Sequence, residues 1–384
     1  MSSAVTRTCS FLAIGGLSIL SGCAADEPLP NPPRDRYGVW ERIEPPGAVC
    51  GNGSQYKFFA NFSETSDDLV VVLEPGGACW DYPSCTGASG IRGAANPDGI
   101  PDDHFELAPF ISPFLQPDDA TSPTNGWNMV YVPYCTGDIH SGNNVITYTD
   151  PEGLGPDVEF HHAGHDNVAA VIDWIDDAFV RVPRMLVTGC SAGGAGALAN
   201  YHAFRQGIAA AERGYLFDDS GPIFPSTGFS APLHAKIRAS WAIDSLAYQF
   251  PDGFDPENFG SISAALATTY PRDRLATSFF QRDQNFSLYS YERFYEPTPT
   301  KDEILTMWAA DTDLMVDQYD AHANLDYYLP YWRELNDSHC TTVVTFAGSE
   351  IQDQGLRLDH WLDDFLADRE VPSAREAPVP GEDE

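Results

Sequence analysis

The sequence predicts an α/β fold with a mostly parallel sheet and helices on both of its faces. Two observations support this class. Short, continuous apolar runs alternate along the chain with segments whose apolar residues recur at helical spacing. Several runs end in glycine, as "LEPGG" does at 73–77. Continuously apolar strands are typical of parallel sheets that are buried on both faces. Ligands bind beyond the carboxyl ends of the strands in such sheets, so functional residues are expected there.

The elements follow one another in a regular order. Strands are expected in six runs: "DDLVVVLEPGG" at 67–77, "WNMVYVPYC" at 127–135, "RMLVTG" at 184–189, "RLATSFFQ" at 274–281, "LDYYLP" at 325–330 and "TTVVTF" at 341–346. Helices are expected at 165–180, from about Ala195 to Ala211, and at 356–369 as a closing amphipathic helix.

Residues 1–22 have the pattern of an export signal. Their apolar core at 11–20 is shorter than the roughly 20 residues that span a bilayer, but it suits a secretory signal. The following "LSGC" resembles the lipobox of bacterial lipoproteins, and this resemblance implies a lipid on Cys23. Because Ala24 rather than an aspartate follows, it also implies the outer membrane. The alternative is an ordinary signal peptide that is cleaved near Ala24 or Ala25.

The folded body is expected between two polar segments. Residues 23–37 are rich in proline and charge and predict a semi-rigid linker. Residues 371–384 lack an apolar period and predict an acidic, flexible tail, which leaves 38–370 as the catalytic domain. The net charge of −35, from 21 basic and 56 acidic residues, argues against a nucleic-acid partner.

Cysteine usage also fits export. Of the eight cysteines, one falls in the signal and one is the lipidation candidate, which leaves an even number for disulfides. The six are Cys50, Cys79, Cys85, Cys135, Cys190 and Cys340. Cys79 with Cys85 is the favoured pair because "CWDYPSC" is a short loop with a proline. None has the spacing of a zinc ribbon, so no metal is expected. The "HHAGH" cluster at 161–165 is expected to be structural for want of an acidic ligand within it.

The segment "GCSAG" at 189–193 matches G-x-S-x-G and makes Ser191 the candidate nucleophile. A serine on a sharp turn between a strand and a helix needs small neighbours, and the turn exposes its hydroxyl above the sheet. Here a strand-like run precedes the motif and a helical pattern follows it. Glycines after the earlier run "LEPGG" expose backbone N–H groups, so Gly76 and Gly77, with Ala192 behind the nucleophile, are the candidate oxyanion hole. Ala78 is a further possible donor.

Three segments in this order resemble the pectin acetylesterase and Notum family: "LEPGGACW" at 73–80, "WNMVYVPYCTGDIHSG" at 127–142 and "LVTGCSAGGAGALANY" at 186–201. The resemblance extends from about residue 50 to 366. It implies an α/β-hydrolase-like fold and ester hydrolysis without a cofactor. Pro75 and Ala78 depart from the family, whose members tend to have a glycine and a bulky aromatic at these places, so the shape of the acyl pocket is open.

The α/β-hydrolase order places an acid and then a histidine after the nucleophile. Among His322, His339 and His360, His339 is the candidate base. It follows a late strand-like run and, as in the resembled family, precedes a cysteine. His360 lies on the closing amphipathic helix and His322 in a polar stretch.

Asp283 is the candidate acid because it follows the strand-like run at 274–281 and precedes an aromatic segment, as in the resembled family. Phe286 stands where the family usually has a glutamine. Asp311 and Asp313 are rivals. Asp138 and His140, at another strand end, could line the pocket or fill buried polar roles.

These features predict an exported, lipid-anchored, monomeric serine esterase that removes an acyl group, with acetyl favoured, from a polysaccharide such as pectin. Two alternatives stay open. One is a fatty-acyl or lipid carboxylesterase, since loss of an aromatic at Ala78 would enlarge the pocket. The other is a catalytically silent surface lipoprotein that binds glycans. The net negative charge of the chain argues against pectin as the substrate, because pectin is itself anionic and would be repelled.

Overall fold

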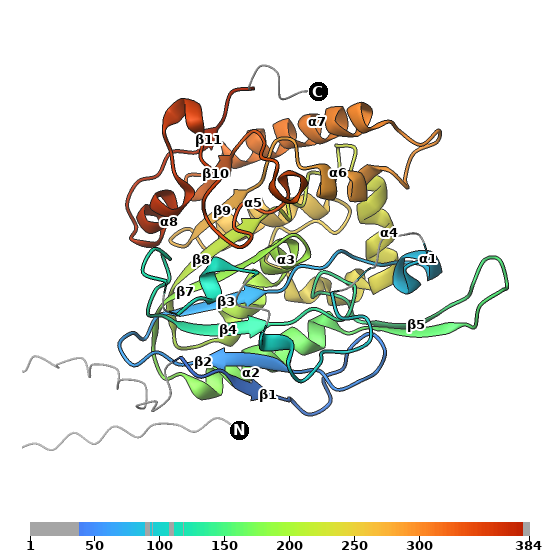
Figure 1. The fold of residues 1–384 in the computed structure, drawn as a ribbon, viewed down its shortest axis with the longest axis horizontal. Coiled ribbons are helices and arrows are strands. Elements are labelled where there is room, and N and C mark those ends of the chain that lie inside the picture. Colours follow the sequence, from blue (N-terminus) through green and yellow to red (C-terminus); the bar gives the residue numbers. More distant parts are fainter. Residues whose placement is uncertain (1–37, 89–92, 94, 107–110, 118, 379–384) are drawn as a thin grey trace, which may run out of the picture.

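The structure is a computed structural model that describes residues 38–378, except 89–92, 94, 107–110 and 118 (Figure 1). The predicted signal peptide, the lipidation candidate Cys23 and the linker up to residue 37 lie outside the described residues. Within the described residues, no helix is long and apolar enough to cross a membrane.

A nine-stranded sheet organises the described part of the chain, in the order β1-β2-β4-β3-β7-β8-β9-β10-β11 (Figure 1). The strands are β1 (Glu41–Ile43), β2 (Phe58–Asn61), β3 (Leu69–Leu73), β4 (Asn128–Val132), β7 (Val182–Cys190), β8 (Ala211–Asp219), β9 (Arg274–Ser278), β10 (Leu325–Leu329) and β11 (Ala374–Arg375). β2 pairs antiparallel with both β1 and β4, and every pair from β4 to β11 is parallel. The predicted α/β class with a mostly parallel sheet is confirmed.

The central strands are buried because both faces of the sheet are covered. All residues of β3 and β4 are buried, as their continuous apolar sequences require. On one face of β8, Tyr215 and Phe217 contact Phe365 of the closing helix and Phe114, respectively. On the other face, helix α3 packs so closely that a side chain on Gly194 would lie 2.5 Å from Asp218 Oδ1.

The helices connect these strands. They are α1 (Tyr82–Thr86), α2 (Gly164–Ala178), α3 (Ala192–Gly207), α4 (Ala231–Trp241), α5 (Ile262–Thr269), α6 (Gln284–Tyr291), α7 (Lys301–Tyr319) and α8 (Leu358–Leu366). In Figure 1, β4 points towards the side on which α1, α4 and α6 lie. The carboxyl ends of the parallel strands therefore face these helices. A separate two-stranded hairpin, β5 (Asn144–Tyr148) with β6 (Val158–His162), projects from the body (Figure 1).

Two sequence predictions are wrong in detail. The run at 341–346 is not a strand but a series of turns, because Asp219 binds the N–H groups of Thr341 and Thr342 that a strand would need. The tail predicted from residue 371 is folded over its first part, since β11 pairs with β10. Glu376 is buried there and accepts hydrogen bonds from the backbone N–H groups of Tyr331 and Gln352, at 2.6 and 2.9 Å.

Candidate active site

Ser191 occupies a sharp turn between β7 and α3. Its backbone has φ 56° and ψ −122°, a left-handed conformation that non-glycine residues rarely adopt. The turn closes because its neighbours have no side chains. A Cβ on Gly189 would lie 2.5 Å from the carbonyl oxygen of Leu73, and one on Gly193 would lie 2.1 Å from the same atom. The glycines of G-x-S-x-G are therefore required by the close approach of β3 to this turn.

The structure brings His339 and Asp283 into contact. His339 Nδ1 lies 2.8 Å from Asp283 Oδ2, in a buried setting where Asp283 has no exposed surface. Asp283 follows β9 and caps α6, where its Oδ1 accepts hydrogen bonds from the N–H groups of Asn285 and Phe286, at 3.0 and 2.8 Å. One carboxylate oxygen thus fixes the aspartate on the helix, and the other is left for the imidazole. This contact holds the His339 tautomer whose Nε2 can accept a proton.

The charges around His339 favour its protonated form. Burial would lower the pKa of this imidazole, but the charge of Asp283, its hydrogen bond and the charge of Asp219 outweigh burial, so the pKa is raised above 6.5. Stabilisation of an imidazolium is what a general base needs when it takes a proton from a hydroxyl.

Asp219, at the end of β8, holds the loop that carries His339. Its Oδ1 accepts hydrogen bonds from the N–H and hydroxyl of Thr341, at 2.7 and 2.9 Å. Its Oδ2 accepts from the N–H and hydroxyl of Thr342, at 2.8 and 2.6 Å. The backbone carbonyl of Asp219 also accepts the N–H of Ser191, at 2.8 Å. One residue therefore contacts both the serine turn and the histidine loop.

A disulfide joins the same two segments. Cys190 precedes the candidate nucleophile, Cys340 follows the candidate base, and the two are bonded across 150 residues of sequence. The other disulfides are Cys50–Cys135 and Cys79–Cys85. The sequence prediction of the Cys79–Cys85 pair is confirmed, whereas it did not select the other two pairs.

Ser191 and His339 line a single cavity of about 480 Å³, together with Gly76, Gly77 and Ala192. Gly76 and Gly77 have φ values of +154° and +79°, so they turn the chain after β3 in a way that side chains disfavour. Among the described residues, the N–H groups of these glycines have no hydrogen-bond acceptor. The N–H of Ala192 is in the first turn of α3 and has no acceptor within the helix. Three candidate donors therefore border the cavity that contains the serine. Ala78 is less suitable, because its N–H donates to the Tyr289 hydroxyl at 3.1 Å.

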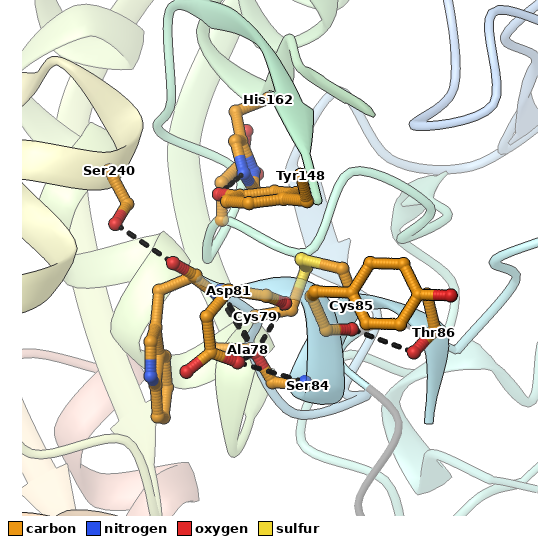
Figure 2. Close-up of a disulfide and its surroundings, with 12 residues drawn as sticks. Ala78, Cys79, Asp81, Ser84, Cys85, Thr86, Tyr148, His162 and Ser240 are labelled. Carbon is orange, nitrogen blue, oxygen red and sulfur yellow. Dashed lines mark hydrogen bonds between the residues drawn. A yellow bond between two sulfur atoms is a disulfide. The ribbon is translucent and has the colours of Figure 1, made fainter. Parts of the chain in front are cut away.

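The segment after Gly77 is braced from several sides (Figure 2). Cys79 is bonded to Cys85 in the short helix α1, which Asp81 caps through its bond from the Ser84 N–H at 2.9 Å. The Ser240 hydroxyl donates to the Trp80 carbonyl at 3.1 Å, which ties this segment to α4. These contacts hold the segment that directly follows the glycine turn.

Most of the cavity wall is apolar. The contributing side chains include Ile139, Ile223 and Val343, together with Leu233, Ile237 and Trp241 of α4, and Phe286, Leu288 and Tyr289 of α6. None of its lining residues among those described is a lysine or an arginine, and Glu74 is the acidic one. The carboxylate of Glu74 accepts the Tyr134 N–H at 2.6 Å, so it ties the chain just before the glycine turn to the segment that follows β4.

The rival residues lie in other settings. Asp311 is buried on α7, where it accepts hydrogen bonds from the N–H groups of Phe229 and Ser230. Asp313 is exposed and pairs with Arg375.

The other histidines and acids at strand ends have structural contacts. His162 bonds with the Tyr148 hydroxyl, at 2.8 Å, and with a backbone carbonyl, as a structural residue would. Asp138 and His140 are buried, but neither lines the cavity. His322 and His360 are also absent from the cavity wall.

Comparison with known proteins agrees with this arrangement. The family model described as Pectinacetylesterase matches residues 39–238, more than half of the chain. The chain belongs to the pectinacetylesterase family. Pectin acetylesterase 7 of Arabidopsis thaliana is 28% identical over 163 residues, which cover 41% of this chain and 38% of that protein. Pectin acetylesterase 4 of the same plant is 29% identical over 164 residues, which cover 41% and 37%. The matches thus span well under half the length of these relatives.

The fold resembles that of the Wnt deacylase Notum from Drosophila. One crystal form aligns with a TM-score of 0.55 and 17% identity, covering 87% of this chain and 96% of Notum. The other aligns with a TM-score of 0.50 and 19% identity, covering 74% and 83%. At this level of identity, the likeness supports the α/β-hydrolase-like fold.

Sequence reasoning missed several residues that shape the site. Asp219 is one among many acidic residues, and no local pattern marks the loop that it binds. Ser230 and His234 also escaped notice, although both line the cavity. A serine just before a helical segment is a recognisable capping signal, but nothing in the sequence places α4 against the cavity.

Proposed function

We propose that the protein is a serine carboxylesterase that works through Ser191, His339 and Asp283. The observation that carries the proposal is the buried His339–Asp283 contact at 2.8 Å, beside a cavity that Ser191 also lines. Family membership supports an ester substrate. No cofactor is needed for this chemistry.

The reaction follows from these positions. Ser191 Oγ attacks the ester carbonyl carbon while His339 Nε2 accepts the hydroxyl proton. The oxygen that becomes negative is stabilised by the N–H groups of Gly76, Gly77 and Ala192. His339 then donates its proton to the leaving alkoxide, and an acyl-enzyme remains on Ser191. Water, deprotonated by His339, attacks this ester and releases the acid, while Asp283 stays ionised throughout.

The first candidate substrate is an acetyl ester on a polysaccharide such as pectin, because this is what the names of the plant relatives indicate. A second candidate, an ester with a larger acyl group, is favoured by the cavity. Its volume of about 480 Å³ lies in the range of pockets that hold drug-sized ligands, about 300–1,000 Å³, and its wall is mostly apolar. Relative kcat/KM on acetyl, butanoyl and octanoyl esters of one chromogenic alcohol separates the two candidates. A steep fall beyond acetyl supports the first, and a flat or rising profile supports the second.

The test of the proposal is hydrolysis of a chromogenic acetate by the full chain, exported so that its disulfides form. Ser191→Ala should lower kcat by about 10⁴-fold or more, and His339→Ala and Asp283→Asn should also lower it strongly. Asp313→Asn, at the exposed rival aspartate, is the matched control and should keep wild-type turnover. Background rates in wild type and Ser191→Ala alike would instead favour the silent glycan-binding lipoprotein.

We also propose that the protein is exported as a monomer and anchored by a lipid on Cys23. The three disulfides support an oxidising compartment. The test is the intact mass of the membrane fraction. A diacylglyceryl adduct that disappears in Cys23→Ala supports the anchor, and an unmodified chain beginning near Ala24 or Ala25 contradicts it. Gel filtration with light scattering checks the monomer.

A further inference from the structure

Two polar side chains at α4 lie in the cavity wall, and each has a polar atom without a hydrogen-bond partner in the part of the chain that the structure describes. Ser230 stands at the N-cap of α4 and His234 one turn later, and both line the cavity beside Leu233, Ile237 and Trp241 of the same helix. Serine at this position ordinarily accepts a hydrogen bond from the first turn. Here the hydroxyl of Ser230 caps nothing.

Both groups are almost completely buried. Ser230 is 1% exposed and His234 is 6% exposed. Ser230 Oγ and His234 Nδ1 are buried and have no hydrogen-bond partner among the described residues, so each needs a side-chain rotation to meet a ligand in the cavity. The His234 ring packs edge-on against the ring of Phe259, with the ring centroids 5.7 Å apart. Buried polar groups are nearly always hydrogen-bonded, so an unpartnered pair in a cavity wall points to a partner on the ligand.

The imidazole of His234 acts here as a neutral group. Burial lowers its pKa to about 4, and no neighbouring charge opposes this. A neutral imidazole both donates and accepts one hydrogen bond, which suits a hydroxyl rather than an ion. His234 is also separate from the proposed proton relay, since His339 is the histidine paired with Asp283.

The remaining wall indicates which part of a substrate enters. Six aromatic side chains line the cavity: Trp80, Phe224, Trp241, Phe259, Phe286 and Tyr289. A sugar would bring many hydroxyl groups into this apolar space and leave most of them unpaired, at a large cost in desolvation. The acyl side of the ester is therefore the part that fits. An acetyl group would leave most of the cavity unfilled, whereas an aryl group packs well against aromatic edges and faces.

We propose that Ser230 and His234 form a polar subsite in the acyl cavity that hydrogen-bonds a hydroxyl on an aromatic acyl group. The substrate class is then an ester of a hydroxylated aryl acid. This inference rests on the proposed esterase function and deepens it, because it assigns the acyl specificity to α4.

A matched pair of substrates tests the subsite. Methyl para-hydroxycinnamate and methyl cinnamate differ by one hydroxyl group, and their hydrolysis by the full chain is followed by chromatography. A site built to bond a hydroxyl discriminates strongly against an analogue without it, because its own polar groups are then left unpaired. We expect kcat/KM to be about 10- to 100-fold higher for the hydroxylated ester. Equal values in the wild type would overturn the proposal.

Variants assign the preference to His234. His234→Phe keeps a ring of similar size but cannot bond a hydroxyl, so the preference should fall to less than about threefold. His234→Gln should retain part of it, and Ser230→Ala should lower it to a smaller extent. His360→Phe makes the same change at an exposed position of α8 and should keep the wild-type ratio. A preference that survives in His234→Phe, or that His360→Phe removes equally, would overturn the assignment. So would a higher kcat/KM on an ω-hydroxy fatty acid methyl ester than on the aryl ester.

A binding experiment keeps this inference separate from the proposed function. In Ser191→Ala the methyl esters are bound but not hydrolysed, so their affinities are measured by calorimetry. The hydroxylated ester should bind about 10-fold more tightly, and Ser191→Ala with His234→Phe should lose this difference. If wild type hydrolyses no ester while this binding difference holds, the proposed function fails and the subsite stands. Equal affinities for both esters in Ser191→Ala would overturn the subsite, whether or not the wild type hydrolyses acetate.

Discussion

Asp219→Asn should disable the site without touching any proposed catalytic residue. The carboxylate of Asp219 is fully buried and accepts two hydrogen bonds from Thr341 and two from Thr342, at 2.6 to 2.9 Å. Asparagine has the same shape, but its NH₂ group must replace one of the two oxygens. In either orientation of the amide, a backbone N–H of the histidine loop then faces another donor.

The size of the effect follows from these contacts. A buried N–H that loses its acceptor costs about 1–3 kcal/mol, and the bonds that remain are no longer charge-assisted and weaken by about 1 kcal/mol each. Two bonds remain on the other oxygen, so we expect the free energy of unfolding to fall by about 3–5 kcal/mol. Because this loop carries His339, a displacement of about 1 Å would lower kcat/KM by roughly 100-fold.

Loss of the Asp219 charge should also change the pH dependence of activity. This charge is one of the influences that raise the pKa of His339, and neutral His339 is the active form of a general base. Without the charge, the pKa of His339 falls, so the acid limb of the pH profile of kcat/KM should move to lower pH. A variant that was merely less stable would not show this shift.

The assay is the pH profile of kcat/KM on the chromogenic acetate, together with urea unfolding. Asp218→Asn is the matched control, since Asp218 is the neighbouring buried carboxylate and contacts the Gly221 N–H and the Thr277 hydroxyl instead. Wild-type unfolding and wild-type kcat/KM in Asp219→Asn would refute the reasoning. Equal losses of unfolding free energy and of kcat/KM in Asp219→Asn and Asp218→Asn would also refute it.

Four further predictions follow from the same structure. Gly193→Ala should abolish turnover and lower the melting temperature, because its Cβ would lie 2.1 Å from the Leu73 carbonyl oxygen; a fully active Gly193→Ala enzyme would contradict the packing of this turn. Replacing both Cys190 and Cys340 by alanine opens a loop of 150 residues and should lower the free energy of unfolding by about 2–5 kcal/mol, measured by urea unfolding; an unchanged midpoint would contradict it. Burial raises the pKa of the Asp218 carboxyl from 3.8 to about 7, so the folded protein keeps this carboxyl protonated at pH values where the unfolded chain has lost the proton. The folded state therefore loses stability as the pH rises from 3.8 to about 7. Asp218→Asn should be more stable than wild type at pH 8 but not at pH 4, as unfolding curves at both pH values would show. The net charge of −35 and the absence of Lys and Arg among the described cavity-lining residues predict that added salt raises activity on acetylated pectin and leaves a neutral acetate ester unaffected; identical salt responses would contradict this.

The sequence was informative wherever function is carried by local chemistry. The turn around Ser191 depends on glycines that are close in sequence, and five strands, β3, β4, β7, β9 and β10, correspond to apolar runs that the sequence predicted. The turn and these strands can be recognised in the sequence because each is determined by residues within its own short segment. Asp283 and His339 were proposed from their order after strand-like runs. The structure places them in contact, which sequence order alone does not establish.

The errors have a common physical cause, which is long-range contact. The run at 341–346 has strand-like composition, but its N–H groups bind a carboxylate on β8, which is 122 residues away from Thr341. The segment after residue 371 has almost no apolar period, yet two residues suffice for β11 because β10 is already in place to pair with it. Asp219, Ser230 and His234 are likewise defined by what the fold brings near them, and their own neighbours in sequence carry no such signal.

The contacts at the end of β8 separate the residues proposed for catalysis from those proposed for acyl specificity. Asp219 accepts the N–H of Ser191 through its backbone and holds the histidine loop through its side chain, while the Cys190–Cys340 disulfide joins the same two segments covalently. The serine turn and the histidine loop are thus fixed to one another through one strand end. The wall of α4 that carries Ser230 and His234 takes no part in these contacts. The proposed catalysis requires the distances between the serine turn and the histidine loop to stay constant, whereas the proposed acyl selectivity depends on the side chains of α4. Substitutions on α4 are therefore expected to change which acyl group is accepted and to leave the proposed proton relay in place.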